Sequence, residues 1–509
     1  MNRRETRHVS TQSRSQAAHS GPPCGRIARR SFVTDLGMGL GTIALGSMLN
    51  RDLRSAEQTP ATVNSSARAE SIPKAKNVIW VFLSGGVSHL ETFDPKPLLN
   101  KFAGKTYDET QLPNPQKLPI YLERSRSVVG MDREVVSKIM PLQVGFQRRG
   151  QSGHWVSDWL PHLGGVVDDL CIVRSMYTTD NDHNAEFQFH TGRHSLDEQQ
   201  PTIGSWISYG LGSLNENLPQ FVFLGQYKDT RVKRNFDANY LGPAHSGIEL
   251  SLDPANPLPF GKLAAGVTAE EQAAQFDLIR RWNTAQAEQF PADSDLQARI
   301  RAYELAYRMQ MSAPEALDLS RETAGTLNVY GVDNATTELY GRRLLTARRL
   351  AERGVRFTLV YLSDYGEWDS HSNIKELHAR SCGRVDKPLA GLIQDLKQRG
   401  MLEDTLVVCA TEFGRTPALE LTSLNKAGTG RDHHPHGFTI WMAGAGLKKG
   451  ILHGATDELG FHAVEHPHYV TDIHATVLRL LGLDSHDLTL PDRKRLEIDF
   501  GRAIEEILA

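Results

Sequence analysis

TLVVCATEFGRTP at residues 405–417, followed after a polar loop by GRDHHPHGFTIWMA at residues 430–443, decides the fold of this chain. The first seven of these residues are apolar or β-branched, which is typical of a strand buried on both faces. The run ends at Glu412, and a second apolar run covers residues 438–443. Ligands of open α/β sheets bind at the carboxyl ends of strands, so the polar segment after the first run is a natural place for a site.

Carboxylate and imidazole groups gather in that polar segment. Glu412 ends the first run, and Asp432, His433, His434 and His436 stand just before the second. Such side chains at a sheet edge suit a divalent metal such as zinc. We therefore take Glu412, Asp432, His433 and His436 as candidate metal ligands. The alternative is a solvated polar loop that is rich in histidine.

The composition is that of an ordinary globular protein. The chain has 509 residues, of which 39% are hydrophobic and 23% charged, so it is long enough for a sizeable core. A formal net charge of -3, without a basic stripe interleaved with aromatic residues, argues against a nucleic-acid partner. The four cysteines show no CxxC spacing, which argues against a disulfide framework and a cysteine zinc site.

The first 56 residues are similar to an export signal. Residues 29–33 read Arg-Arg-Ser-Phe-Val, and the mildly apolar stretch at 36–49 is too short to span a bilayer. We predict a twin-arginine signal peptide at residues 1–56, a linker at 57–75 and no stable transmembrane anchor. The expected location is the periplasm or cell envelope, and the twin-arginine export machinery is an expected partner. The alternative for this stretch is a buried N-terminal helix, which its glycine and serine content disfavours.

The predicted strand at residues 77–83 ends in a glycine turn. Gly85 and Gly86 would let the backbone approach a ligand, and free N–H groups at such a turn favour an anion. Glu91 and Asp94 follow as possible metal ligands. Asp94 is equally consistent with a simple turn, because a proline follows it.

Two more predicted strands end in acidic and imidazole side chains. These strands, at residues 170–177 and 355–362, are followed by Asp182, His183, Glu186, Asp369 and His371. His183, Glu186 and His190 share one face if their segment is helical, and the alternative is an ordinary capped helix start. We expect these groups to join the site.

The helices expected between the strands complete the architecture. We predict helices at about 340–352, 385–399 and 470–481, and a solvated arginine face on the first of them. The order strand, helix, strand, helix, strand across 340–482 indicates an α/β fold with a largely parallel sheet. Thr268 and Glu271 form a capping box at the start of a helical insertion at about 265–335.

Several motifs resemble known families. Thr411-Glu412-Phe413-Gly414 resembles the strand-Thr/Ser-Asp-His-Gly motif of the alkaline phosphatase and sulfatase superfamily, and Asp369-Ser370-His371 resembles its earlier metal motif. The chain from about 77 to 505 is similar to the exported family called domain of unknown function 1501. The segments that carry this second resemblance are 85–88 (GGVS), 93–97 (FDPKP), 412–415 (EFGR), 430–433 (GRDH) and 456–460 (TDELG).

The resemblance implies a three-layer α/β/α sandwich at residues 76–509, but it does not imply a known reaction. Our first hypothesis is an exported metal-dependent hydrolase of sulfate or phosphate esters. It implies one or two divalent ions, zinc or calcium, and an anionic ester or a sulfated or phosphorylated glycan as substrate. Asp369, His371, Glu412, His433 and His436 would hold the ions. His183 would act as the acid, Arg415 would clamp the anion, and Ser88 is a further catalytic candidate.

The chain also departs from the superfamily pattern. Ser84 stands where an aspartate usually follows the first strand, Phe413 replaces a usual histidine, and the sulfatase nucleophile motif is missing. Ser175, Thr178 and Thr179 are alternative nucleophiles, and none of them is singled out. The competing hypothesis is therefore a non-catalytic member of the fold that binds a polysaccharide or an envelope partner.

Overall fold

The computed structural model describes residues 73–126, 138–225, 230–252, 266–291, 293–420, 428–490 and 493–509. The predicted signal peptide at 1–56 and nearly all of the linker at 57–75 lie outside these residues. Within the described part, no helix combines the length and the apolar character that crossing a membrane requires.

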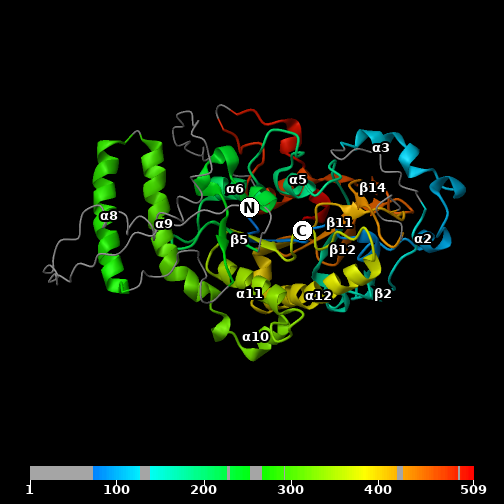
Figure 1. The fold of residues 1–509 in the computed structure, drawn as a ribbon, viewed down its shortest axis with the longest axis horizontal. Coiled ribbons are helices and arrows are strands. Elements are labelled where there is room, and N and C mark those ends of the chain that lie inside the picture. Colours follow the sequence, from blue (N-terminus) through cyan, green and yellow to red (C-terminus); the bar gives the residue numbers. More distant parts are fainter. Residues whose placement is uncertain are drawn as a thin grey trace, which may run out of the picture.

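A nine-stranded sheet forms the centre of the molecule (Figure 1). Its order is β12 (Ile451–His453), β4 (Cys171–Tyr177), β11 (Phe438–Ala443), β8 (Thr405–Ala410), β1 (Asn77–Phe82), β7 (Phe357–Tyr361), β5 (Phe221–Leu224) and β6 (Ile248–Leu250), with β15 (His468–Tyr469) also paired to β4. The pairs from β8 to β6 are parallel, as are those of β12 and β15 with β4. The predicted α/β class with a largely parallel sheet is confirmed.

The second apolar run of the deciding stretch differs from its neighbours in direction. β11 runs antiparallel to both β8 and β4. Between β8 and β11 the chain returns through the short pair β9 (Gly414–Arg415) and β10 (His433–His434). A parallel connection would need a crossover, which is usually a helix, and no helix is formed by the described residues there.

Helices cover both faces of the sheet, and the alternation of side chains along β1 separates the two cores. Ile79 and Val81 pack with the core under α11 (Glu338–Glu352) and α12 (Ile374–Gln398). Trp80 and its even-numbered neighbours pack on the other side, toward α5, α6 and α13. The latter helices span Ala185–Thr191, Ile203–Leu211 and Val470–Leu480. The expected α/β/α layering is thus present, with α11 and α12 opposite α5 and α6 (Figure 1).

The predicted helical insertion forms a pair of long helices. α8 (Ala269–Gln289) begins at the predicted capping box, in which Thr268 and Glu271 bond each other's backbone N–H groups. α9 (Ser294–Leu317) lies beside it and packs against α11. Figure 1 shows α8 at one end of the molecule, with α9 between it and the sheet.

Shorter elements surround these layers. They are α2 (Pro97–Lys101), α3 (Pro119–Glu123), β2 (Phe146–Arg149), β3 (His154–Ser157), α4 (Pro161–Gly164), α7 (Thr230–Lys233), α10 (Ala324–Val329), β13 (Ala455–Thr456) and β14 (Ala463–Glu465).

The prediction of a solvated arginine face on α11 is wrong for three of its four arginines. Arg343, Arg348 and Arg349 are at most 5% exposed. Arg348 lies 2.9 Å from both Glu322 and Asp395, which come from other segments of the chain. Amphipathic spacing alone does not separate a solvated cation from one that is buried against distant carboxylates.

Candidate metal centre

Four segments deliver polar side chains to the carboxyl edge of the sheet. Asp369 and His371 follow β7, and Glu412 follows β8. His433 belongs to β10, and His183 lies in the turn between β4 and α5. The structure brings these five predicted site residues together.

Three imidazole Nε2 atoms converge on one carboxylate. Asp369 Oδ1 lies 2.9 Å from the Nε2 of His371 and 3.1 Å from the Nε2 of His433. Asp369 Oδ2 lies 3.1 Å from the Nε2 of His183. The Nε2 atoms of His371 and His433 are themselves 3.1 Å apart.

The opposite nitrogen of each of these rings faces an oxygen. His183 Nδ1 lies 3.0 Å from Glu412 Oε1, and His433 Nδ1 lies 2.8 Å from the backbone oxygen of Asn181. His371 Nδ1 bonds the buried carboxylate of Glu420. If each Nδ1 donates its proton outward, each Nε2 presents a lone pair to the centre of the cluster. Histidines that bind metals are held in this way.

The spacing of the inner atoms fits a metal ion. Asp369 Oδ1 and the Nε2 atoms of His371 and His433 form a triangle with edges of 2.9, 3.1 and 3.1 Å. Ligands of tetrahedral zinc lie about 3.3 Å apart, given zinc–ligand distances of about 2.0–2.1 Å. The triangle is therefore close to one face of a zinc coordination tetrahedron.

Two overlapping groups of potential ligands share His433. One contains His183 and Asp369, the other contains His371 and Asp432, and in each the ligand atoms lie within 4.8 Å of one another. The cluster therefore offers enough donors for one ion with spare ligands or for two neighbouring ions.

Protons would occupy the cluster in the absence of an ion. Burial opposes protonation of His183, but hydrogen bonds to Asp369 and Glu412 raise its pKa to about 10. Burial also opposes protonation of His371, but hydrogen bonds to Asp369 and Glu420 raise its pKa to about 9. Burial lowers the pKa of His433 to about 3. A metal bound by His371 would displace the proton of its Nε2.

Gly85 lies directly against the backbone at Asp369. A Cβ on Gly85 would lie 2.6 Å from the backbone nitrogens of both Trp368 and Asp369, and its φ of +117° favours glycine. The N–H of Gly85 donates to Glu412 Oε1 at 2.8 Å. Glycine is therefore required for close approach at this turn.

The predicted role of Arg415 as an anion clamp needs correction. Its side chain is 0% exposed, and Nη2 lies 2.7 Å from Asp369 Oδ1. Its guanidinium also donates to the backbone oxygens of Gly85, Gly86, Trp368 and Arg431. Because its donors are engaged with the protein, Arg415 positions Asp369 and is not available to a substrate.

Two of the other predicted ligands bind cations of the protein. Glu91 pairs at 2.8 Å with Arg431, both side chains being 0% exposed, and also accepts from Ser88 Oγ. Asp94 lies 3.0 Å from Lys96 Nζ. In this arrangement these carboxylates, and Ser88 with them, stabilise the loop after β1.

His436 likewise lies among other partners. Its ring packs on Tyr121, with centroids 4.8 Å apart, and stacks on Phe461 at 5.8 Å. Asp432, in contrast, remains at the cluster, where its Oδ1 lies 3.8 Å from His371 Nδ1. The structure therefore does not group Glu91, Asp94 or His436 with the metal centre.

Sequence analysis missed Glu420 and the carbonyl group of Asn181. Glu420 lies in the polar loop of the deciding stretch, so an acidic side chain between two motif segments was the available signal. A backbone carbonyl leaves no such signal in a sequence.

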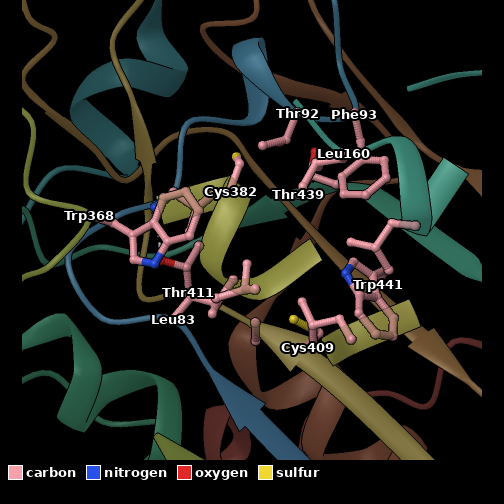
Figure 2. A pocket seen from close by; sticks show the side chains of 15 residues that line it. Leu83, Thr92, Phe93, Leu160, Trp368, Cys382, Cys409, Thr411, Thr439 and Trp441 are labelled. Atoms are coloured by element: carbon pink, nitrogen blue, oxygen red, sulfur yellow. Dashed lines mark hydrogen bonds between the residues drawn. The ribbon is translucent and has the colours of Figure 1, made fainter. Parts of the chain in front are cut away.

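An apolar cavity lies next to the metal centre (Figure 2). Trp368 and Thr411, which directly precede Asp369 and Glu412, line it together with the thiols of Cys382 and Cys409. Its lining contains no charged side chain, so it is unsuited to an anionic ester.

Comparison with known proteins gives one family match. The family model described as protein of unknown function (DUF1501) matches residues 75–508. No curated protein matches the chain.

Several solved structures are similar at low sequence identity. A protein of the alkaline phosphatase superfamily from Vibrio parahaemolyticus is 12% identical, with a TM-score of 0.39 over 93% of this chain and 79% of that one. The PsFucS1 sulfatase from Pseudoalteromonas sp. is 12% identical, with a TM-score of 0.37 over 92% and 76%. The phosphonate monoester hydrolase SpPMH from Silicibacter pomeroyi is 14% identical, with a TM-score of 0.33 over 69% and 71%.

Proposed function

The chain belongs to the DUF1501 family of proteins of unknown function, and we propose that it is a metal-dependent hydrolase of sulfate or phosphate esters. One observation carries the proposal: three imidazole Nε2 atoms and Asp369 converge, while each Nδ1 is braced by an oxygen. Without a cation or shared protons, these lone pairs and the carboxylate would repel one another.

The donor set favours zinc over calcium. Asp369, His371 and His433 would hold the ion. Imidazole nitrogen is a good ligand for zinc, whereas calcium takes oxygen ligands. A bound ion of this kind polarises an ester oxygen and activates water.

The candidate nucleophiles, the catalytic candidate Ser88 and also Ser84 are all hydrogen-bonded to other groups of the protein. Ser84 Oγ donates to the buried Glu186, and Ser88 Oγ donates to Glu91. Ser175 Oγ donates to the backbone oxygen of His466 at 2.6 Å, and Thr178 Oγ1 donates to Gln188. Thr179 Oγ1 accepts a hydrogen bond from Gln188 at 2.7 Å. Since none of these hydrogen bonds joins a hydroxyl to Asp369 or to the three imidazoles of the cluster, we propose attack by water instead of a covalent intermediate on a side chain.

His183 is the group best suited to proton transfer. Its side chain is 15% exposed, the imidazole lies between Asp369 and Glu412, and Nδ1 is anchored by Glu412. A proton at Nε2 would then face the centre of the cluster, where a leaving oxygen would lie. His183 would therefore act as the general acid of the proposed reaction.

The charge of the cluster bears on the number of ions. Asp369, Glu412, Glu420 and Asp432 are opposed by Arg415 and by His183 in its protonated, acidic form, which gives a formal charge of -2 when the other histidines are neutral. One divalent ion would bring this to 0 and a second to +2. An anionic ester is attracted only when two ions are bound. We therefore propose two ions for a sulfate or phosphate ester, whether the ester is a small molecule or part of a glycan.

Export remains part of the proposal. The arginine pair at residues 29–30 supports twin-arginine export to the periplasm or cell envelope. Export of the folded chain would allow the metal to be loaded before export.

A non-catalytic member of the fold is the second candidate. The hydrogen bonds of the candidate hydroxyl groups favour this alternative, because none of them directs a hydroxyl toward the metal centre as a nucleophile. Such a protein would bind a polysaccharide or an envelope partner and retain the metal only as a structural element.

Metal analysis and hydrolysis assays test the proposal together. We would purify the mature protein without chelator, measure its metals by elemental analysis, and assay sulfate and phosphate esters. Asp369→Asn should lose both metal and hydrolysis, while Asp484→Asn, which changes an exposed aspartate beside His486, should retain both. Absence of metal from the wild type, even after reconstitution, would overturn the metallohydrolase. Retained metal without hydrolysis of any ester would favour the second candidate.

A further inference from the structure

A second imidazole cluster lies at the edge of the sheet beyond β4. His453 ends β12 and His468 begins β15, and both strands pair in parallel with β4. His466 lies in the turn just before β15. This cluster shares no residue with the metal centre described above.

His453 and His468 face each other through their Nε2 atoms. These nitrogens are 2.8 Å apart, and the rings stack with centroids 5.0 Å apart. Two nitrogens at this distance require a proton or a cation between them, because two lone pairs would repel. Both side chains are largely buried, at 8% exposure for the whole His453 residue and 14% for the His468 side chain, so water does not readily replace that contact.

A carboxylate fixes the orientation of His468. Its Nδ1 lies 3.2 Å from Oδ2 of Asp472, which belongs to the first turn of α13. Donation from Nδ1 to Asp472 leaves the Nε2 of His468 as a lone pair that points at His453. A carboxylate, a histidine and a metal in this order are common in metal sites.

His466 supplies a third imidazole beside the pair. Its ring centroid is 5.2 Å from that of His453. Its φ is +45°, a left-handed conformation that is unfavourable for a residue other than glycine. The hydroxyl of Ser175 donates to its backbone oxygen at 2.6 Å and so holds the turn. The strained turn keeps His466 next to the pair.

We propose that His453 and His468 form a second metal site, for a borderline divalent transition ion such as zinc, copper(II) or nickel, and that His466 joins them when its exposed side chain turns toward the pair. Imidazole suits these ions, and Asp472 would act as the outer carboxylate. Zinc ligands lie about 3.3 Å apart, so the pair would open by about 0.5 Å to admit the ion. This site is independent of the proposed hydrolase activity.

Zinc titration of the chelated full chain tests the site. The double variant His453→Gln/His468→Gln should lose one zinc equivalent, or bind it at least 100-fold more weakly, while Asp369→Asn retains that equivalent. His486→Gln is a matched control, because His486 also lies 3.2 Å from a carboxylate, that of Asp484, but is exposed. Unchanged zinc stoichiometry and affinity in the double variant would overturn the proposal.

A measurement on the unaltered protein covers the case in which the double variant does not fold. Crystals of the full chain soaked in zinc should give an anomalous diffraction peak between His453 and His468. A zinc-soaked crystal with anomalous peaks only elsewhere would equally overturn the proposal. Because the main centre and this site give separate peaks, failure of one is distinguishable from failure of the other.

Discussion

Replacing Glu420 by glutamine tests whether outer carboxylates tune the metal centre. The Glu420 side chain is 4% exposed and bonds His371 Nδ1. Glutamine retains the size of the side chain and an oxygen that can accept from Nδ1, but removes the negative charge. His371 Nε2 should then be a poorer ligand, because its electron density depends on the group that accepts the proton of Nδ1.

The expected magnitude depends on a neighbouring carboxylate. Loss of an outer-shell partner lowers metal affinity by about 10–100-fold, or about 1.4–2.7 kcal/mol. Asp432 Oδ1 lies only 3.8 Å from the same Nδ1. Burial and the charge of Glu420 raise the pKa of Asp432, so removal of that charge favours its ionised form. Asp432 should therefore compensate in part, which places Glu420→Gln near tenfold and Glu420→Gln/Asp432→Asn near 100-fold.

Zinc competition against a chromophoric chelator would measure both variants. Glu403→Gln is the control, because Glu403 pairs with Lys449 at the surface and is 75% exposed. Zinc binding by Glu420→Gln within about twofold of the wild type would show that the outer carboxylate does not tune His371. Equal zinc affinity of the double and single variants would show that Asp432 does not compensate.

Three further changes probe the centre and its support. Gly85→Ala would place a Cβ 2.6 Å from the Asp369 nitrogen. We expect loss of bound metal, measured by elemental analysis, and a destabilisation of about 1–3 kcal/mol, measured by thermal unfolding. Normal metal content would contradict this. Glu91→Gln should cost about 3–5 kcal/mol in urea unfolding, because it leaves the buried Arg431 without its counter-ion; a loss below 1 kcal/mol would count against a buried pair. Burial lowers the pKa of His474 to about 4, so between about pH 4 and pH 6.5 this residue is protonated in the unfolded chain but mostly neutral in the folded chain. Below the ordinary pKa of about 6.5, His474 should therefore destabilise the protein, by about 2 kcal/mol at pH 5 relative to pH 7. His474→Gln should remove this part of the pH dependence, and an unchanged dependence would refute the assignment.

The buried strands were predictable because burial on both faces leaves a simple signature. Continuous apolar runs at 77–83, 355–362 and 405–411 became β1, β7 and β8 at the centre of the sheet. The polar residues that follow such runs must lie at the same edge when the strands are parallel. Asp369 and Glu412, which follow β7 and β8, do lie at one edge, where both contact His183. His433 precedes β11 and reaches the same edge because β11 is antiparallel.

Longer-range pairing was not predictable from local pattern. Glu91 looked like a metal ligand, but it binds Arg431, which is 340 residues away in the chain. Arg348 looked solvated, but it meets Glu322 and Asp395 from other segments. A charged side chain has the same local appearance in a sequence whether its partner is water, a metal or a distant residue.

The sequence by itself determined the α/β class, the main strands and the edge at which the polar groups gather, because burial and strand period are local properties. Only the tertiary structure decided which of those groups face one another. The Nε2 atoms of His183, His371 and His433 meet at Asp369 because three separate segments come together at one edge of the sheet. The distances between these atoms, and the oxygens that face each Nδ1, depend on contacts between segments that are far apart in the sequence.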